Sequence, residues 1–297
     1  MDWEKLKLFH TVAEAGNLTH AAERLNMSQS ALSRQIKALE TELNLALFTR
    51  HARGLVLTQE GEQLYAAAKD VFQKIDAVEQ SLQEGKEKPF GRLRITTTVA
   101  FGTFWLTPHL NDFARLFPDI RLELILTDKD VDLSGGEAEV AIRFHTPEQA
   151  DLIQRPLVPI HQHIYAAPQY LTRKGTPERA EDLDGHDLVV YGPAGESPHL
   201  ELDWILKAGC RSRKRKPRLM VNSHFGVMQA VKAGLGIGAL PDYMAPPNPD
   251  LVRILNDVAG PEYKAYFVYP SELKKSKRIN EFRDYLVKQV LAEASKL

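Results

Sequence analysis

The N-terminal quarter of the chain carries apolar residues at the three- and four-residue spacing of short helices. A first helix is predicted where this spacing ends at a glycine, over Trp3, Leu6, Phe9, Ala13 and Gly16. The same spacing predicts a second helix over residues 19–25 and a third that ends near Leu39. Asn26 and Met27 form a turn between them, and Ser28 is placed to cap the third helix with its hydroxyl. Two short helices, a tight turn and a longer helix predict a helix-turn-helix unit.

The outward face of the third predicted helix carries side chains that suit nucleic-acid binding. Gln matches the edge of adenine and Arg that of guanine, whereas a purely structural helix more often pairs Glu with Lys on its exposed face. Residues 47–58 then predict a short β-hairpin, or wing. Similar helix pairs occur in proteins that bind no DNA, so the arginines near the wing tip strengthen the prediction. The expected DNA-binding residues are Ser28, Gln29, Ser30, Ser33, Arg34, Lys37, Arg50 and Arg53.

Composition places the chain among globular proteins and locates its positive charge. The length of 297 residues suggests about two domains, and 43% hydrophobic residues exclude a disordered chain. With 38 basic and 39 acidic residues the net charge is −1, which excludes a polycation that coats nucleic acid. Between Arg24 and Arg53, however, five basic residues stand against two acidic ones, a local charge of +3. Cys210 is the single cysteine, which excludes an internal disulfide and a cysteine-built zinc site.

The helix-turn-helix region resembles the LysR-type transcriptional regulators. The resemblance rests on residues 21–40 and on the patterns Leu43-x-x-x-Leu47-Phe48-x-Arg50 and Arg53-Gly54-x-x-Leu57-Thr58-x-x-Gly61. It implies an N-terminal all-α winged helix-turn-helix with a linker helix, and a C-terminal α/β two-lobed domain like a periplasmic binding protein. The expected boundaries are 1–58 for the DNA-binding domain, 59–88 for the linker, 91–161 with 265–297 for lobe 1, and 162–264 for lobe 2.

A longer helix with a narrow apolar stripe follows the wing. Its apolar positions are separated by alternating steps of four and three residues, the rhythm of a coiled-coil seam, and are Leu64, Ala68, Val71, Ile75, Val78 and Leu82. The alternative is a helix packed on its own domain, which would normally show a wider stripe. We expect these residues to form a dimer seam, and residues 87–91 a hinge. The resemblance implies a homodimer or homotetramer that binds a pseudo-palindromic operator in double-stranded DNA.

Strands and helices alternate in the remaining two thirds, which predicts an α/β domain. The expected strands are 93–99, 122–126, 139–144, 157–167, 187–191, 217–221 and 263–269, and the expected helices are 104–116, 201–208, 225–233 and 275–294. Leu106-x-Pro108, the run Gly136-Glu137-x-Glu139-Val140-Ala141-Ile142-Arg143 and Ala233-Gly234-x-Gly236-Ile237-x-x-Leu240-Pro241 resemble the effector domain of the same family. The resemblance implies that the chain crosses between the lobes near His161 and Tyr263.

A small-molecule effector is expected between the two lobes. The first strand leads into a helix start rich in hydroxyls and free N–H groups, which suits an anion. Arg143 at a strand end either pairs with a carboxylate ligand or ties the lobes together. The family's topology brings Ser223 and His224 to the cleft. We expect a polar or anionic effector bound by Thr97, Thr98, Phe101, Arg143, Ser223 and His224.

Other motifs favour structural interpretations. Gly234, Gly236 and Gly238 follow a helix and precede a strand, the reverse of a dinucleotide loop. His161 and His163 could share a metal, but a polar lobe crossing is favoured. The basic run 211–218 could contact DNA, but a solvated loop is favoured, and a redox role for Cys210 lacks a resolving cysteine.

The rival to a regulator is a solute-binding protein or an enzyme on the two-lobed fold. The N-terminus shows no secretory signal, which argues against a transport receptor. Common catalytic signatures are absent, which argues against an enzyme. No stretch is apolar enough for a membrane span. We expect a cytoplasmic, non-enzymatic protein without cofactor or metal.

Overall fold

The computed structural model describes residues 2–51, 54–83, 88–145, 149, 151–192, 201–210, 215–245 and 248–294. The chain separates into two compact units, Met1–Gly85 and Lys86–Leu297. Each unit has its own hydrophobic core. The two are therefore described one at a time.

Three helices open the N-terminal unit: α1 (Trp3–Ala15), α2 (Leu18–Arg24) and α3 (Gln29–Leu43). Gly16 ends α1 with a φ of 61°, a left-handed conformation that glycine adopts without strain. The hydroxyl of Ser28 caps α3 by accepting the N–H of Ala31 at 3.2 Å. These features confirm the predicted helix-turn-helix. The third helix runs to Leu43 rather than Leu39, because Leu43 still packs on the core although the residues before it are polar.

The wing is a two-stranded antiparallel sheet of β1 (Phe48–His51) and β2 (Gly54–Leu57), with His51 opposite Gly54. Its second strand is anchored on the end of α1, because the N–H of Leu55 donates to the carbonyl of Gly16 at 3.0 Å. Gly54 allows this approach: a Cβ there would lie 2.8 Å from the Gly16 oxygen. The hairpin therefore has a fixed orientation relative to the first helix.

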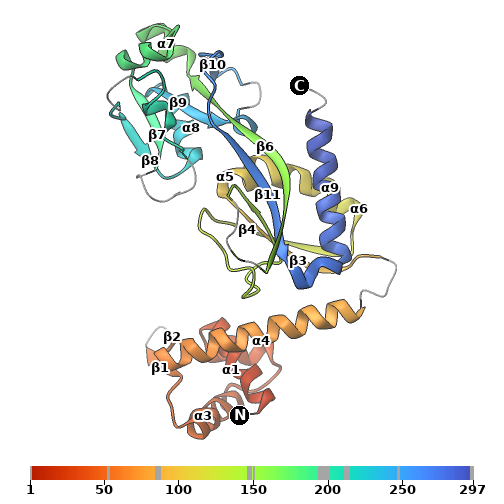
Figure 1. Cartoon of the computed structure of the whole chain (residues 1–297). Helices are drawn as coiled ribbons and strands as arrows, with labels where there is room; N and C mark the ends of the chain where they lie inside the picture. The colour runs from red at the N-terminus through yellow and green to blue at the C-terminus, as the bar shows by residue number, and fades with distance from the viewer. Residues whose placement is uncertain are drawn as a thin grey trace. The chain divides into compact units, whose positions relative to one another are not determined.

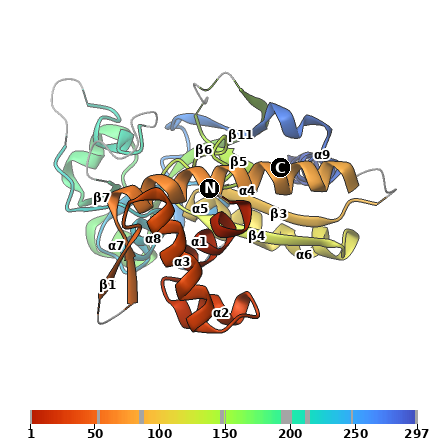
Figure 2. The ribbon, with the colours of Figure 1, turned by 90° about the horizontal axis from the view of Figure 1, so that it is seen from below.

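The linker helix α4 (Gln59–Gln83) begins as part of the N-terminal unit's own core. The hydroxyl of Thr58 starts it by accepting the N–H of Gly61 at 3.0 Å. Ring contacts join it to α1, with 4.7 Å between the centroids of Trp3 and Phe72. The first three helices and the hairpin gather around its N-terminal half, and its C-terminal half extends beyond them (Figures 1 and 2).

The C-terminal unit is built on one path of paired strands in the order β4-β3-β5-β11-β6-β9-β7-β8, with β10 added beside β6. Their bounds are β3 (Gly91–Thr97), β4 (Ile120–Leu126), β5 (Val140–Arg143), β6 (Leu152–Ala166), β7 (Leu188–Tyr191), β8 (Leu219–Val221), β9 (Ile237–Pro241), β10 (Val252–Ile254) and β11 (Glu262–Pro270). The long antiparallel strands β6 and β11 run side by side from one lobe into the other (Figure 1). Parallel pairs flank them, β3 with β4 and β5 in one lobe and β7 with β8 and β9 in the other. The expected two-lobed α/β fold is confirmed.

The helices of the C-terminal unit follow the sequence pattern with three corrections. The helix expected from residue 104 begins at Val99 and has three segments: α5 (Val99–Phe101), the π-helical turn η1 (Gly102–Leu106) and α6 (Thr107–Leu116). The helix expected over 201–208 is instead a 3₁₀ turn, η3 (Trp204–Leu206), whose three consecutive apolar side chains are all buried. The remaining α-helices are α7 (Pro168–Lys174), which the sequence reading missed, α8 (His224–Lys232) and α9 (Lys277–Ala294). Further 3₁₀ turns are η2 (Ala180–Gly185), η4 (Asp242–Met244) and η5 (Ser271–Lys275).

The glycines before β9 serve close packing. The N–H of Ile237 donates to the carbonyl of Asp187 at 2.8 Å, and a Cβ on Gly236 would lie 2.3 Å from that same oxygen. Gly234 has a φ of 74°, which favours glycine. The glycines therefore let the chain pass close to the start of β7. This packing explains their presence without a dinucleotide-binding loop.

Candidate functional site

The exposed face of α3 presents most of the residues expected to bind DNA. Gln29, Ser30, Arg34 and Lys37 are exposed, and Ser33 is half-buried. Ser28 is exposed but already caps the helix and lies 3.2 Å from the hydroxyl of Ser30. The opposite face, with Leu32, Ile36 and Leu39, is buried. Amphipathic packing thus fixes the helix and directs its polar side outward.

The cations of α3 are available to a partner, whereas the nearby acids are used inside the unit. Within the part of the chain that the structure describes, neither Arg34 nor Lys37 forms an ion pair. The carboxylate of Glu40 accepts the N–H of Leu47 at 2.8 Å and so positions the start of the wing. Glu42 accepts a hydrogen bond from Lys5 at 2.9 Å, which lowers the pKa of its carboxyl to about 2. Both acids of the segment with the local charge of +3 are thus engaged within the unit, while the cations of α3 remain exposed.

Two of the residues expected to bind DNA, Arg50 and Arg53, belong to the wing. Arg50 lies on β1 opposite Leu55. The side chain of Arg50 and all of Arg53 fall outside the described residues. Their proposed role in gripping DNA stays a prediction.

The apolar seam of α4 divides into two parts. Ala68 is 1% exposed and Leu64 packs against the same core, so both belong to the N-terminal unit itself. Val71 and Ile75 are 41% and 38% exposed and are not among the residues of that core. The side chains of Val78 and Leu82 lie outside the described residues. Packing inside the winged domain thus uses Ala68 and part of Leu64, and the contact with a partner that was expected for the seam stays a prediction.

Two adjoining cavities lie between the start of α5 in one lobe and the start of α8 in the other. The larger, of about 300 Å³, is lined by Val99, Ala100, Thr103, Phe104, Asp128, Ser223, His224 and Phe225. The smaller, of about 60 Å³, is lined by Thr98, Asp128, Phe144, Ile160, Gln162, Tyr191, Leu202, His224, Pro241, Tyr243 and Tyr263. Asp128 and His224 line both. A hollow that combines aromatic walls with a few polar groups is typical of small-molecule sites.

The structure brings three of the expected effector residues to these cavities and places the others elsewhere. Thr98, Ser223 and His224 line them. Thr97 is buried, and its hydroxyl donates to the carbonyl of Ile142 at 3.0 Å. Phe101 is 0% exposed and belongs to the core of the first lobe. We therefore remove Thr97 and Phe101 from the candidate site, because their side chains point into sheet and core.

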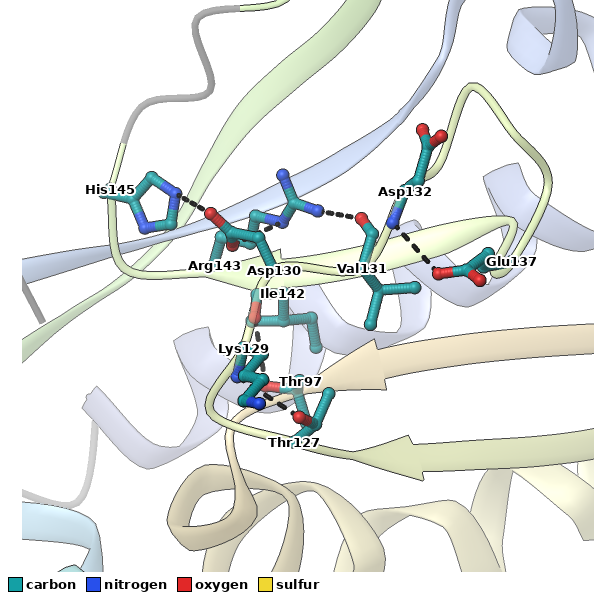
Figure 3. Close-up of polar contacts among 10 residues, drawn as sticks. All are labelled: Thr97, Thr127, Lys129, Asp130, Val131, Asp132, Glu137, Ile142, Arg143 and His145. Atoms are coloured by element: carbon teal, nitrogen blue, oxygen red, sulfur yellow. Dashed lines mark hydrogen bonds and ion pairs between the residues drawn. The ribbon is translucent and has the colours of Figure 1, made fainter. Parts of the chain in front are cut away.

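Arg143 is a structural residue of the first lobe. Its guanidinium donates to the carbonyl of Val131, and its Nε lies 3.5 Å from a carboxylate oxygen of Asp130 (Figure 3). Asp130 in turn lies 3.2 Å from Nε2 of His145. The side chain thereby fixes the loop that follows β4. Arg143 neither lines the two cavities nor joins the lobes. Its role in holding this loop therefore replaces the two expected roles, which were to bind a carboxylate ligand or to tie the lobes together.

Desolvation sets the protonation of the polar groups in the cavities. Burial lowers the pKa of His224 from 6.5 to about 4, so its ring is neutral at physiological pH. Burial also raises the pKa of the Tyr243 and Tyr263 hydroxyls, and carboxylates near them raise it further. These tyrosines therefore remain neutral hydrogen-bonding groups.

The lowered pKa of His224 predicts a measurable dependence of stability on pH. In the unfolded chain this histidine binds a proton below about pH 6.5, whereas the folded state resists protonation until about pH 4. Its contribution is therefore fully present above pH 6.5 and decreases as the pH falls toward 4. In thermal unfolding, His224→Gln should flatten this decline, whereas His20→Gln at an exposed site should not. Equal pH profiles for wild type and His224→Gln would contradict the assignment.

Sequence reasoning missed several residues that line the cavities. Asp128 follows the carboxyl end of the parallel strand β4, and its position in the sequence could have indicated it. Tyr191 ends β7 in the same way. Gln162, Tyr243 and Tyr263 come from the lobe crossing and a 3₁₀ turn. No local pattern marks them, because tertiary structure alone brings them together.

The remaining candidate sites have structural explanations. Among the described residues no three histidines, cysteines or acids form a metal-binding group. His161 lies 3.4 Å from both Asp242 and Glu262, which fits the polar lobe crossing. Arg215 corrects the view of the basic run as a solvated loop, because its side chain is buried and donates to the carbonyls of Ala180 and Ala208. None of the helices in the described ranges is long and apolar enough to cross a membrane.

Comparisons with known proteins agree with both units. Residues 3–62 match the bacterial regulatory helix-turn-helix protein of the lysR family, and residues 86–291 match the LysR substrate binding domain. The chain is 32% identical over 284 residues to the uncharacterized HTH-type transcriptional regulator YhjC of Escherichia coli, covering 95% of each chain. It is 29% identical over 294 residues to the HTH-type transcriptional regulator CrgA of Neisseria meningitidis, covering 97% of this chain and 96% of that one. The full-length structure of the Vibrio cholerae virulence activator AphB superposes with a TM-score of 0.62 at 26% identity, covering 97% of this chain and 99% of that one. The chain therefore belongs to the LysR family of transcriptional regulators.

Proposed function

We propose that α3 is the recognition helix and reads base edges in the major groove of an operator. The observation that carries this proposal is the pair of exposed cations on α3, Arg34 and Lys37, neither of which forms an ion pair among the described residues. Arg34 lies near the N-terminal end of the helix, the end that enters the groove in helix-turn-helix proteins. Its guanidinium suits the two acceptors of guanine, while Lys37 suits phosphate.

The C-terminal half of α4 is the proposed dimer contact. Val71 and Ile75 are apolar and exposed, and the C-terminal half of α4 extends beyond the other helices of its unit (Figure 1). A symmetric pair of these helices would carry two winged units, which favours a pseudo-palindromic operator. Val78 and Leu82 continue the heptad spacing and are included in the proposal.

The cavities between the lobes are the proposed effector site. Residues of both lobes line them, so a bound molecule contacts both lobes at once. A ligand changes the regulator only if its affinity differs between two arrangements of the lobes or subunits. The effector thus acts by shifting the population of these arrangements. The proposal includes a cytoplasmic location and no enzymatic activity.

Replacing Arg34 tests the recognition role directly. Arg34→Ala should lower the preference for operator over shuffled DNA by about 10- to 100-fold, because a bidentate contact to guanine discriminates by about 1–3 kcal/mol. Arg50→Ala, as the matched control, should weaken binding to both DNAs alike, because phosphate contacts carry no sequence information. Fluorescence anisotropy with the region upstream of the protein's own gene measures both. Equal losses on both DNAs for Arg34→Ala would remove its base-reading role.

A further inference from the structure

The charge in the two cavities is opposite to that of an anion site. Asp128 lines both cavities, and none of the described residues that line them is a lysine or an arginine. His224 is neutral because burial lowers its pKa to about 4. Arg143, the cation expected to meet an anion, is held by Val131 and Asp130 away from the cavities. A carboxylate ligand would therefore meet a carboxylate of the protein.

Two of the backbone N–H groups at the helix start, where an anion was expected, already have acceptors within the protein. The N–H of Val99, at the start of α5, donates to Oδ1 of Asp128 at 3.1 Å. The N–H of Phe101 points to the hydroxyl of Thr98 at 3.4 Å. The protein thus supplies its own anion at the helix start, where the sequence suggested a place for the ligand's charge. This arrangement leaves Oδ2 of Asp128 without a partner among the described residues.

Asp128 is exposed and shares the lining of both cavities with aromatic side chains. Tyr243 and Phe144 line the smaller cavity beside Asp128, while Phe104 and Phe225 line the larger one with 6.1 Å between their ring centroids. The hydroxyl of Tyr263, at the smaller cavity, is buried and has no hydrogen-bond partner within the described part of the chain. Aromatic faces attract cations, and a carboxylate among them adds a charged hydrogen-bond acceptor.

We propose that the cavities bind an organic ammonium compound, whose cationic head meets Asp128 and whose apolar body packs against Phe104 and Phe225 in the larger cavity. This inference rests on the proposed function, in which the effector occupies these cavities. The size agrees, since a cavity of about 150 Å³ holds a benzene ring and the larger one here measures about 300 Å³. The proposed effector is thus a cation, whereas the sequence suggested a polar or anionic molecule.

Three small probes with the same ring but different charge test the inference on the full-length protein. Phenethylamine is a cation, phenylacetamide is neutral and phenylacetate is an anion. Isothermal titration should show the amine binding at least about tenfold more tightly than the carboxylate, because its head gains a charge-assisted hydrogen bond where the carboxylate is repelled. Asp128→Asn should weaken amine binding by about tenfold or more and reduce the difference among the probes.

The asparagine variant preserves the fold, because its side-chain oxygen can still accept the N–H of Val99. Asp119→Asn, the same change at an exposed site outside both cavities, should leave all three affinities unchanged. Phenylacetate binding as tightly as the amine, or no amine binding at millimolar concentration, would overturn the inference. Operator binding by the same preparation separates this inference from the proposed DNA-binding function. If the probes give either of these contrary results while the protein still binds its operator, only the inference about the ligand fails.

Discussion

Replacing Arg278 by Met should lower the free energy of unfolding of the C-terminal unit by about 3–5 kcal/mol, the usual cost of removing one partner from a buried ion pair. Arg278 lies on α9, is 2% exposed, and donates to Oε1 of Glu139. The other oxygen of Glu139 accepts the N–H of Arg94 at 3.0 Å. The acid of the Glu139-Val140-Ala141 motif therefore attaches the last helix to the first lobe. Methionine fills a similar volume but leaves this carboxylate without its cation.

Arg283 on the same helix offers a matched control. Its side chain is 28% exposed and pairs with the adjacent Asp284 at 2.7 Å. Pairs of this kind contribute about 0–1 kcal/mol. In urea unfolding Arg283→Met should therefore change stability little. Similar losses for the two variants would contradict the assignment of Arg278 as a buried structural cation.

Replacing Val71 and Ile75 together by Asp should convert the protein to a monomer and weaken operator binding by about 100-fold or more, because a second linked half-site multiplies affinity by that order. Four carboxylates at the proposed seam of a dimer would repel one another where apolar side chains should pack. The fold of the N-terminal unit should persist, because both side chains are exposed in the single chain. Sedimentation velocity measures the assembly, and anisotropy with operator DNA measures the affinity.

The control for this variant is Ala66→Asp. Ala66 is exposed on α4 and lies five and nine residues before the two seam positions, so helical geometry places it on another face. This substitution should leave assembly and operator affinity unchanged. A dimer that survives in the Val71 and Ile75 double variant would show that α4 does not form the subunit contact.

Local sequence patterns predicted the DNA-binding unit well, because its elements depend on contacts a few residues apart. The cap at Ser28 and the glycine at Gly16 are examples. The same patterns could not tell whether an apolar stripe packs inside a chain or against a partner. Leu64 and Ala68 share the heptad spacing of Val71 and Ile75, but Ala68 is buried and Leu64 is partly buried in their own domain.

The effector site was harder to predict, because distant segments form it. Thr97 and Phe101 have suitable chemistry and lie near the correct helix start, yet the strand pairing and the helix face turn both inward. Asp128 decides the charge of the cavities, although it lies 29 residues from the N–H that it accepts. A basic residue near a strand end, such as Arg143, suggested an anion until its partners in the folded chain were known.

We propose above that this chain binds a specific DNA sequence through the basic face of α3. The most direct test of this proposal is a titration of the full-length protein with the region upstream of its gene and with a shuffled copy, repeated over a range of salt concentrations. We expect affinity for both DNAs to fall steeply with salt, because cations released from phosphates drive binding, while the upstream region remains preferred by about 1,000-fold or more. Binding that is insensitive to salt, or equal affinity for the two DNAs, would show that α3 is not a sequence-reading helix.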